Sequence, residues 1–381
     1  MKPLDRLRAA FQVRAGSPAD GVWVGPGRVN LIGEHTDYND GLALPLAISR
    51  GVSVAARRRR DRRVRCWSLQ RAEPGDHSLD SFVPGRGGSW HRYCAAGAWA
   101  LEQLVGPLGG ADLVVDSTLP IGSGLSSSAA LEVAVVLALA ELHGLELDPL
   151  DHVRVAQRAE TEGLGVPVGA MDQTASVLGR DGRALLFDAR ASSVDPVPFE
   201  LDDDVTLVIL DTRSERRLDA VAYADRRREC EEAAEAFGVA SLRDLDSGEL
   251  ARRRGGVEPV LAARAEHVVS ENARVGQVAA LLQRGRRDEI GPLLTESHAS
   301  LRDLFEVSAP PLDLAVAAAL EAEALGARMT GAGFGGCALA LVHSGGVASL
   351  RDRVVAAFAE AGLAEPDVFA ERASAGARRL A

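Results

Sequence analysis

The stretch GRVNLIGEHTDYND, residues 27–40, joins an apolar strand pattern to a dense group of polar side chains. Its first half carries apolar residues in the way that a half-buried strand does. Two acids and an imidazole, Glu34, His35 and Asp37, follow directly. A solvated loop would not need the apolar anchor, so the stretch predicts polar groups that are presented from the end of a strand.

The composition indicates a globular chain with more than one domain. Of its 381 residues, 46% are hydrophobic and 25% are charged, which is ordinary for a protein with a substantial core. One compact domain of this length is uncommon, so we expect two. The formal net charge of −11 at pH 7 argues against general binding to nucleic acid or to anionic membranes, but it permits a local anion site.

Arginines at 57–60, 62 and 63 form the densest basic cluster, within GVSVAARRRRDRRVRCWSL, residues 51–69. The cluster could serve an anionic ligand or nucleic acid, or it could be the solvated tip of a hairpin between two strands. No aromatic side chains interleave the arginines to stack on bases, so we favour the hairpin tip.

Several features concern the cellular compartment. The four cysteines show no paired or metal-ligand spacing, which predicts free thiols in a reducing compartment. The N-terminal residues lack the apolar core of a signal peptide. The most apolar run, residues 133–140, is far shorter than the roughly 20 residues that cross a bilayer. We therefore expect a cytoplasmic protein.

Lys2 is the only lysine in the chain. A Walker A loop ends in a lysine that contacts the phosphates, and a protein kinase needs a lysine on a strand of its N-terminal lobe. The chain has neither device, so any nucleotide phosphates must be held in another way.

The order of the patterns predicts mixed helix and strand. ADLVVDSTLP, residues 111–120, is a strand that leads into a long helix. Two prolines and an acidic cluster in residues 191–205 could join two domains. Residues 216–300 are mostly helical, and a glycine-rich turn, a strand, a helix and a last strand follow. Strict βαβ alternation is missing, so we expect an α+β fold.

LPIGSGLSSSAALE, residues 119–132, places glycines and serines at the start of that helix. Gly122 and Gly124 permit tight turns, and Ser126–Ser128 lie at a helix N-terminus, where unpaired N–H groups and the helix dipole attract anions. An ordinary helix cap needs one serine. Two glycines and three serines exceed that need, but a cap and a phosphate-binding loop both stay open on this motif alone.

Three further features are ambiguous singly. Asp172 follows the glycine-rich turn in GVPVGAMDQT, residues 165–174, where an acid is commonly a turn or capping residue. Glu160 alone is a charged residue of the preceding helix. MTGAGFGGC, residues 329–337, packs four glycines into a segment that could bind an anion or form a bend.

Taken together, the four motifs occur in the order and approximate spacing of the GHMP small-molecule kinases. The chain resembles that superfamily over essentially its whole length, most clearly in residues 20–345. Within it, GRVNLIGEHTDYND is similar to the signature of the galactokinases, and AYADRRREC, residues 222–230, resembles another galactokinase segment.

The resemblance implies a role for each matching residue. Asp172 would be the catalytic base, and Arg28 would lie beside it and stabilise the transition state. The sugar would contact five side chains: Glu34, His35, Thr36, Asp37 and Tyr223. ATP would be held by Ser68 and by the glycine–serine loop: Gly122, Ser123, Gly124, Leu125, Ser126, Ser127 and Ser128. Ser128 and Glu160 match the ligands of Mg²⁺, the cofactor that accompanies the co-substrate ATP.

The implied reaction is the ATP-dependent phosphorylation of the C1 hydroxyl of α-D-galactose, which gives galactose 1-phosphate and ADP. Phosphoryl transfer depends on positioning and charge stabilisation. Arg28 would stabilise charge on the transferring group and favour the ionised form of Asp172, which would accept the proton of the sugar hydroxyl.

Two alternatives share these motifs. A GHMP kinase for a related sugar (N-acetylgalactosamine, L-arabinose or galacturonate) could use the same sugar-binding residues with small changes nearby. A non-catalytic sensor of galactose and ATP would have the same fold, but such sensors tend to be altered in the serine-rich loop. Here GLSSSAA, residues 124–130, is intact, which favours the enzyme.

The resemblance also implies the architecture, a two-domain GHMP kinase fold with the active site in the cleft between the domains. The N-terminal domain, residues 1–195, would resemble domain 2 of ribosomal protein S5, and the C-terminal domain, residues 196–381, would be ferredoxin-like. The last segment could pack back on the N-terminal domain. We expect galactose and ATP as partners, no nucleic acid, no membrane, and a monomer.

Overall fold

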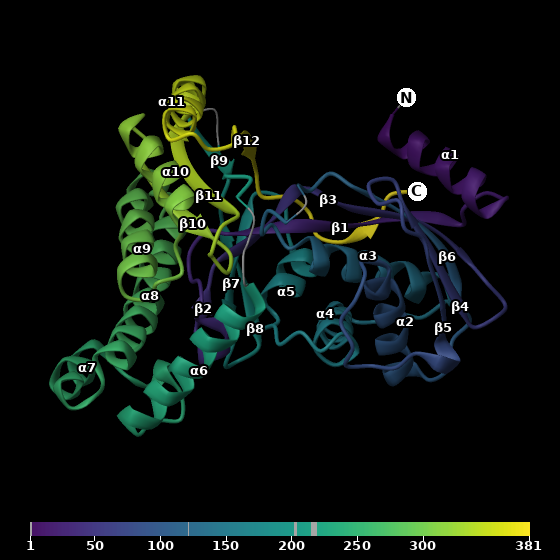
Figure 1. Cartoon of the computed structure of the whole chain (residues 1–381), viewed down its shortest axis with the longest axis horizontal. Helices are drawn as coiled ribbons and strands as arrows, with labels where there is room; N and C mark the ends of the chain where they lie inside the picture. The colour runs from purple at the N-terminus through teal and green to yellow at the C-terminus, as the bar shows by residue number, and fades with distance from the viewer. Residues whose placement is uncertain (1, 121, 202–203, 215–218) are drawn as a thin grey trace.

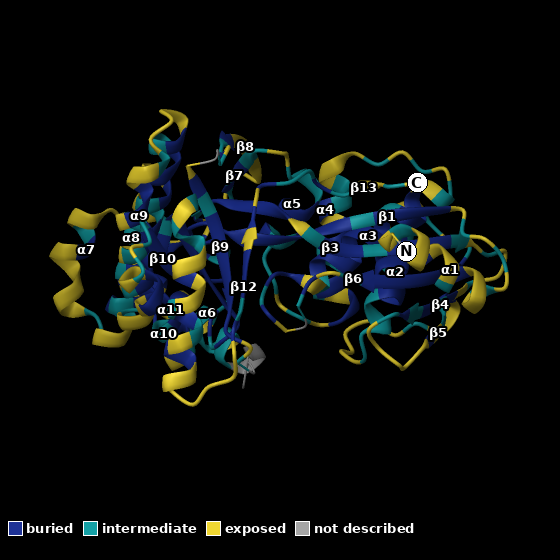
Figure 2. Cartoon of the chain, turned by 90° about the horizontal axis from the view of Figure 1, so that it is seen from above, coloured by how far each residue is buried: buried dark blue, intermediate teal, exposed yellow. Residues whose placement is uncertain are grey.

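The structure, a computed structural model, describes residues 2–120, 122–201, 204–214 and 219–381. Figure 1 shows an elongated molecule in which strands β1 (Gly21–Asn30) and β3 (Pro45–Arg58) run between two halves. The N-terminal half is built on one large sheet, and the other half combines a smaller sheet with a layer of helices. Figure 2 shows that buried residues concentrate in the strands and the helices beside them, while α7 (Ser247–Arg253) is largely exposed.

The large sheet has the strand order β13–β1–β3–β6–β4–β5. β4 is parallel to β6, and the other neighbouring pairs are antiparallel. Its remaining strands are β4 (Arg63–Ser68), β5 (Gly75–Ser78), β6 (Ala111–Ser117) and β13 (Arg378–Arg379). The sequence ADLVVDS of β6 is buried along nearly its whole length, as expected of a strand inside a sheet.

The arginine-rich segment is not the hairpin that we predicted, because β6 lies between β3 and β4 in the sheet. The segment connects two strands that are not neighbours in the sheet, and its guanidinium groups form ion pairs with carboxylates. Arg57 and Arg59 pair with the buried Asp112 at 2.6 and 2.9 Å, and Arg62 pairs with Glu102 at 2.7 Å. These ion pairs neutralise much of the cluster and agree with a structural role for it.

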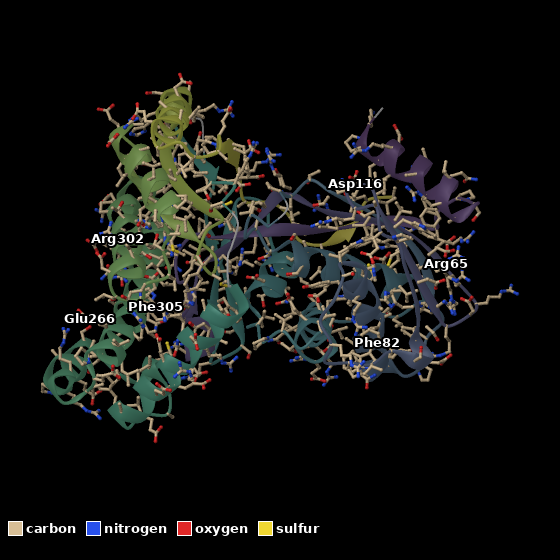
Figure 3. All side chains as sticks on the ribbon, viewed as in Figure 1. Arg65, Phe82, Asp116, Glu266, Arg302 and Phe305 are labelled. Atoms are coloured by element: carbon tan, nitrogen blue, oxygen red, sulfur yellow. The ribbon has the colours of Figure 1, made fainter. Side chains whose placement is uncertain are left out.

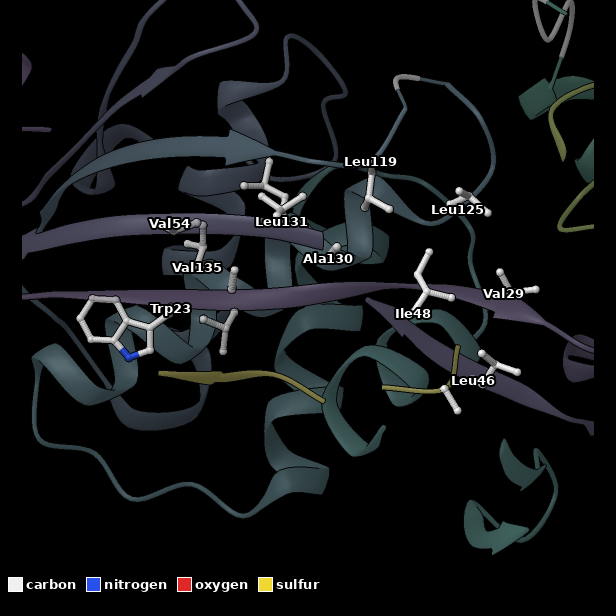
Figure 4. Packing of buried hydrophobic residues seen from close by; sticks show 14 of the residues in the cluster. Trp23, Val29, Leu46, Ile48, Val54, Leu119, Leu125, Ala130, Leu131 and Val135 are labelled. Carbon is white, nitrogen blue, oxygen red and sulfur yellow. The ribbon is translucent and has the colours of Figure 1, made fainter. Parts of the chain in front are cut away.

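Helix α3 (Ser127–Leu142) packs along β1 and β3 and forms the centre of the N-terminal core. Its sequence is apolar on all sides, which suits a helix enclosed on all sides. Figure 4 shows Ala130, Leu131 and Val135 of this helix close to side chains of the two strands. A Cβ on Gly25 would lie 2.2 Å from the Ala130 carbonyl oxygen, so only glycine lets β1 approach the helix this closely.

The other helices of the N-terminal half complete two layers around the large sheet. α1 covers one face, where Leu7 and Phe11 are fully buried and Arg6 pairs with Asp116 at 2.6 Å. Asp116 is labelled in Figure 3 below this helix. The helices of this half besides α3 are α1 (Pro3–Ala15), α2 (His91–Val105), α4 (Pro149–Arg158) and α5 (Met171–Leu178). A π-helical turn, Ala159–Gly163, follows α4.

The second half contains an antiparallel sheet of order β10–β11–β9–β12, covered by helices. Its strands are β9 (Val205–Asp211), β10 (Gly326–Thr330), β11 (Cys337–His343) and β12 (Asp367–Glu371). Its helices besides α7 are α6 (Asp219–Phe237), α8 (Pro259–Gln283), α9 (Gly291–Asp303), α10 (Pro310–Glu321) and α11 (Val347–Glu360). β11 follows the glycine-rich segment as predicted, and β10, which was not predicted, precedes it, so the glycines form a turn between two buried strands.

The segment predicted as a linker, residues 191–205, contains a strand. β8 (Ser193–Pro198) pairs with β7 (Arg183–Asp188), and β2 (Leu42–Ala43) completes a three-stranded sheet. The predicted domain boundary, between residues 195 and 196, lies inside β8. The division of the chain into two domains at this point stays a prediction. At the end of the chain, β13 pairs with β1.

Two features bear on the cellular setting. Among the described residues, we find no helix of the length and apolar character required to cross a membrane. Cys66, Cys94, Cys230 and Cys337 are all buried and none forms a disulfide, as predicted.

Candidate active site

A cavity of about 840 Å³ opens between the two halves, and residues from both line it. Most of the residues selected from the sequence meet there: Arg28, Glu34, His35, Asp37, Gly122, Gly124, Ser126, Ser127, Ser128, Asp172 and Tyr223. Their elements are far apart in the sequence: the end of β1 and the following turn, the start of α3, the start of α5, and α6. The cavity therefore depends on the complete fold.

Five of the selected residues do not line the cavity, and one of them is the buried Glu160, described below. The Thr36 hydroxyl is fully buried, 2.7 Å from the Leu42 carbonyl oxygen, and shapes the turn after β1. Ser123 donates to the Pro120 carbonyl oxygen, and Leu125 belongs to the hydrophobic core. Ser68 accepts hydrogen bonds from the backbone at the end of β4. These positions support the scaffold in this structure, and their roles in binding stay predictions.

Asp172 and Arg28 form an ion pair with two hydrogen bonds in the cavity. Arg28 Nε donates to Asp172 Oδ1 at 2.7 Å and Nη2 donates to Oδ2 at 3.0 Å, so both carboxylate oxygens are fixed. Arg28 Nη1 donates to the Gly124 carbonyl oxygen at 2.6 Å. The Asp172 side chain is 29% exposed, against 7% for Arg28, so the carboxylate faces the cavity while the guanidinium anchors it.

Ser126 excludes one interpretation of the serine-rich loop for its own side chain, the ordinary helix cap. It precedes the first residue of α3, but its side chain makes no capping hydrogen bond, and its φ of 57° is in the left-handed region. Its hydroxyl instead donates to Asp172 Oδ2 at 2.5 Å. Ser126 is therefore not an ordinary helix cap. Its side chain makes no hydrogen bond to the first backbone N–H groups of α3.

Glu160 lies in the π-helical turn and is buried against Ser128, Glu132 and Gln173. Gln173 Nε2 donates to Glu160 Oε2 at 2.7 Å. Burial, together with the negative charge of Asp172, raises the pKa of Glu160 to about 7. The Glu160 carboxylate and the Ser128 hydroxyl lie side by side. Together they could supply two oxygen ligands to a hard divalent cation.

The described residues include no group of three or more His, Cys, Asp or Glu side chains that could hold a metal ion by themselves. Ser128 and Glu160 alone would leave most positions of an octahedral Mg²⁺ open, which is how this ion usually binds when nucleotide phosphates and water supply the rest. The residues present therefore fit the expected ion.

Asp37 lies close to the glycine turn before α5. A Cβ on Gly169 would be 1.9 Å from Asp37 Oδ2, so glycine is needed there for space. Burial, with the nearby charge of Asp172, raises the pKa of Asp37 to about 6. Asp37 and Asp172 thus place two carboxylates close together in the cavity. Carboxylates accept hydrogen bonds, so this part of the cavity suits a ligand that carries hydroxyl donors.

His35 sits in a cluster of rings from three segments. Its ring centroid is 4.8 Å from that of Phe305 and 5.7 Å from that of Tyr223. Phe305 is labelled among the helices of the second half in Figure 3. Burial lowers the pKa of His35 to about 3, so the ring is neutral at neutral pH. Its Nε2 must donate to the Ala332 carbonyl oxygen, 3.1 Å away, which leaves Nδ1 to accept from the Tyr38 hydroxyl at 2.8 Å.

Sequence reasoning missed several groups around the cavity. Arg328 pairs with Glu34 at 2.6 Å although 294 residues separate them, and no local pattern signals such a pair. Burial raises the pKa of Glu34, and the charge of Arg328 opposes that effect. The end of β9 and the loop after it add three lining residues, Asp211, Arg213 and Ser214, whose sequence signal was their place at the end of a buried strand.

Comparisons with known proteins agree with this geometry. The model of the GHMP kinases N terminal domain matches residues 92–180, and that of the GHMP kinases C terminal matches residues 278–360. A mevalonate kinase of Methanococcus jannaschii has the same fold, with a TM-score of 0.67 at 17% identity over 92% of this chain and 98% of that one. The chain is a GHMP kinase, and the predicted fold class is confirmed.

Closer relatives narrow the class. The galactokinase galactose-binding signature matches residues 9–58. A galactokinase of Streptomyces coelicolor is 46% identical over 374 residues, 97% of each chain, and one of Roseiflexus sp. is 41% identical over 380 residues, 98% of this chain and 96% of the relative. The structure of Lactococcus lactis galactokinase complexed with galactose has a TM-score of 0.95 at 33% identity and covers all of both chains. The chain belongs to the galactokinase family and is a sugar kinase.

Proposed function

We propose that this enzyme transfers the γ-phosphoryl group of ATP to the C1 hydroxyl of galactose, with Asp172 as the base. The observation that supports this most strongly is the triad of Asp172, Arg28 and Ser126 at the junction of the two predicted binding regions. Within one cavity, Asp172 accepts a hydrogen bond from Ser126 of the glycine–serine loop, and its charge acts on Asp37 of the sugar signature.

The hydrogen bonds on Asp172 select the oxygen that takes the proton. Each carboxylate oxygen accepts about two hydrogen bonds. Oδ2 already accepts from Arg28 Nη2 and from Ser126, whereas Oδ1 accepts, among the residues that the structure describes, only from Arg28 Nε. Oδ1 therefore has the free lone pair, and we propose that it accepts the proton of the C1 hydroxyl as the sugar oxygen attacks the γ-phosphorus.

Arg28 has two tasks in this proposal. It fixes the direction of the carboxylate through a bidentate contact, and its positive charge lies where negative charge develops on the transferred group. The guanidinium is itself held by the Gly124 carbonyl oxygen, so it cannot swing away from the base. This preorganisation replaces the lysine of other phosphate-binding loops.

The galactose hydroxyls would be bound by Asp37, His35, Glu34 and Tyr223. Asp37 offers acceptor oxygens, and Tyr223, whose ring lies 5.7 Å from that of His35, offers a hydroxyl. Burial raises the pKa of Tyr223 well above its usual value, so its hydroxyl stays a donor at neutral pH.

The phosphates of ATP would lie at the start of α3, on the backbone N–H groups of the loop from Gly122 to Ser128. Ser128 and Glu160 would hold Mg²⁺, which when bound neutralises charge on the phosphates. Binding of the cation beside Glu160 would favour the ionised form of this acid, whose pKa is raised in its absence.

We further propose that the enzyme acts as a monomer in the cytoplasm, with domains divided near residue 195. One chain supplies every group in the proposed mechanism, and four buried cysteines that form no disulfide suit a reducing compartment.

A coupled ADP-release assay with ATP and Mg²⁺ over a panel of sugars tests the proposed activity. We expect galactose to give the highest kcat/KM, above N-acetylgalactosamine, L-arabinose and galacturonate. A higher value for another sugar of the panel would assign the enzyme to that sugar. ATP and galactose binding without turnover would identify a sensor.

A further inference from the structure

Arg328 is the most deeply buried cation near the sugar-signature segment, and the mechanism above does not use it. It lies on β10, one residue before the Met-Thr-Gly of the glycine-rich turn, and it is 0% exposed. Nη2 donates to Glu34 Oε2 at 2.6 Å, while Nη1 donates to the carbonyl oxygens of Asn30 and Leu31 at 3.2 and 3.1 Å. One guanidinium therefore holds both the end of β1 and the acid that follows it.

Glu34 receives further donors that fix its orientation. Oε2 also accepts from Asn30 Nδ2 at 2.8 Å, and Oε1 accepts from the Gly331 amide at 2.8 Å. Thr330 contributes a weaker contact at 3.3 Å. The carboxylate thus joins the segment after β1 to the turn between β10 and β11, and residues of both segments line the cavity.

Glu271 of α8 completes the arrangement from a third element. Its Oε1 accepts from the Gly33 amide at 3.0 Å and from the Ser297 hydroxyl at 2.7 Å, and it lies 3.7 Å from Arg328 Nη2. Despite complete burial, the charges of Arg328 and its neighbours lower the pKa of Glu271 to about 2. The acid is therefore ionised and holds the backbone directly before Glu34.

We propose that Arg328 and Glu271 are positioning residues that set the enzyme's selectivity for its sugar, by fixing the segment Gly33–Asp37 in the orientation that binds galactose. This inference rests on the proposed function for the identity of the sugar. Neither residue lines the cavity, so both act through Glu34 and the Gly33 backbone. The second half of the molecule would then shape the sugar site of the first.

Stability alone does not account for the arrangement. A buried ion pair loses its hydration, and well-packed apolar residues of similar volume often stabilise a protein equally well. Hydrogen bonds between guanidinium and carboxylate groups are directional, whereas contacts between apolar residues are not. Three hydrogen bonds from two nitrogens of the planar Arg328 guanidinium locate Glu34 relative to the ends of β1 and β10. Glu34 in turn fixes the Gly331 turn, which lines the cavity.

The test uses Arg328→Lys in the full-length enzyme. A lysine keeps the charge but lacks the planar fork, so it cannot bond Glu34 and both carbonyl oxygens at once. A displacement of about 1 Å in a positioning group can cost about 10²-fold. We therefore expect the KM for galactose to rise by about 30-fold, with the KM for ATP within about 2-fold of the parent, and the ratio of kcat/KM for galactose over glucose to fall by at least about 10-fold.

Two further variants separate positioning from general stability. Glu271→Gln keeps the size of the side chain and an acceptor oxygen, and we expect the same kinetic pattern at about a third of the size. Asp112→Asn is the matched control, because Asp112 is fully buried and pairs with three arginines in the large sheet, away from the cavity. It should lower the melting temperature without a change in either KM or in the sugar ratio.

The outcomes are distinct from a failure of the proposed function. If the parent enzyme does not phosphorylate galactose, the proposed function fails before any variant is compared. If the parent does and either folded variant keeps the parent's galactose KM and sugar ratio, Arg328 and Glu271 are structural only and the inference is overturned. Should Arg328→Lys not fold, Glu271→Gln decides by the same measurements, supported by calorimetry of galactose binding without ATP.

Discussion

The two ends of the cavity are built in different ways. At the proposed sugar end, Glu34 and His35 are 2% and 5% exposed, and side chains from β10, α6 and the helical layer contact them. At the proposed phosphate end, Gly122 and Ser127 are exposed, and the loop offers backbone N–H groups and hydroxyls at the start of α3. Asp172 adjoins both ends, because it accepts a hydrogen bond from Ser126 and its charge acts on Asp37.

This difference follows from what each end has to recognise. A sugar is distinguished by the direction of its hydroxyl groups, so its partners must be fixed by many contacts before it arrives. Phosphates are identified by charge, and a helix N-terminus supplies this from the backbone without long-range side-chain contacts. Changes at the sugar end should therefore alter galactose binding, and changes at the phosphate end should alter ATP or turnover.

The largest expected effect comes from Asp172→Asn, at the junction. The amide cannot accept the hydroxyl proton as a carboxylate does, so kcat should fall by about 10³-fold. Galactose and ATP should each bind with nearly unchanged affinity in calorimetry. Asp195→Asn on β8, an exposed acid outside the cavity lining, is the control and should behave as the parent. Near-normal turnover of Asp172→Asn would remove the base from the mechanism.

Gly169→Ala tests the sugar end alone. The added Cβ would lie 1.9 Å from Asp37 Oδ2 and must displace that carboxylate. We expect the KM for galactose to rise by about 10²-fold with little change in the KM for ATP. Gly87→Ala is the matched control, since its Cβ would meet nothing nearer than 3.8 Å. A rise in the ATP KM equal to that for galactose would contradict the separation of the two ends.

Asp37 should also make stability depend on pH. Its pKa is raised from 3.8 to about 6 by burial first and by Asp172 second, so the folded state binds its proton more tightly than the unfolded chain. The resulting stabilisation is full below pH 3.8 and is lost as the pH rises through about 6. Relative to Asp37→Asn, the parent without ligands should lose about 2 kcal/mol of unfolding free energy between pH 4 and pH 7.

Urea unfolding of both proteins at several pH values measures this difference. A constant difference between parent and variant across that range would show that the environment of Asp37 does not shift its titration. The variant must be compared without galactose, because the sugar would bind the two proteins differently.

Ser126→Ala gives the smallest effect and tests the phosphate end. The serine donates to Asp172 and does not cap α3. Its removal should lower kcat by about 10-fold. The unfolding free energy should change by under about 0.5 kcal/mol, less than the roughly 1 kcal/mol typical of a lost cap. The reverse pattern, a cap-like loss of stability with unchanged kcat, would assign the hydroxyl to the helix.

The sequence supported the fold and the local motifs because both have local causes. The long apolar run of residues 127–142 and the strand pattern of residues 111–120 predicted a helix and a strand, and the structure places them there. The motifs that met at the cavity were recognisable because phosphate binding and sugar binding each need several residues within a few positions of one another.

Contacts between distant elements were beyond such reasoning. The pairing of β4 with β6, which removed the predicted hairpin, depends on the order of strands in space. Arg328 and Glu271 lie on elements far from Glu34 in the sequence, and a buried arginine looks like any other arginine in a chain with many. The left-handed conformation of Ser126, which turns its hydroxyl from the helix to Asp172, was likewise invisible.

The central claim is that the enzyme phosphorylates galactose at C1 with Asp172 as the base. ³¹P NMR of a reaction with galactose, ATP and Mg²⁺ tests it most directly, with Asp172→Asn in parallel. We expect the parent enzyme to form one galactose 1-phosphate for each ADP, and the variant to form almost no galactose 1-phosphate. Phosphate on another hydroxyl, ADP with free phosphate and no sugar phosphate, or equal product from the variant would contradict it.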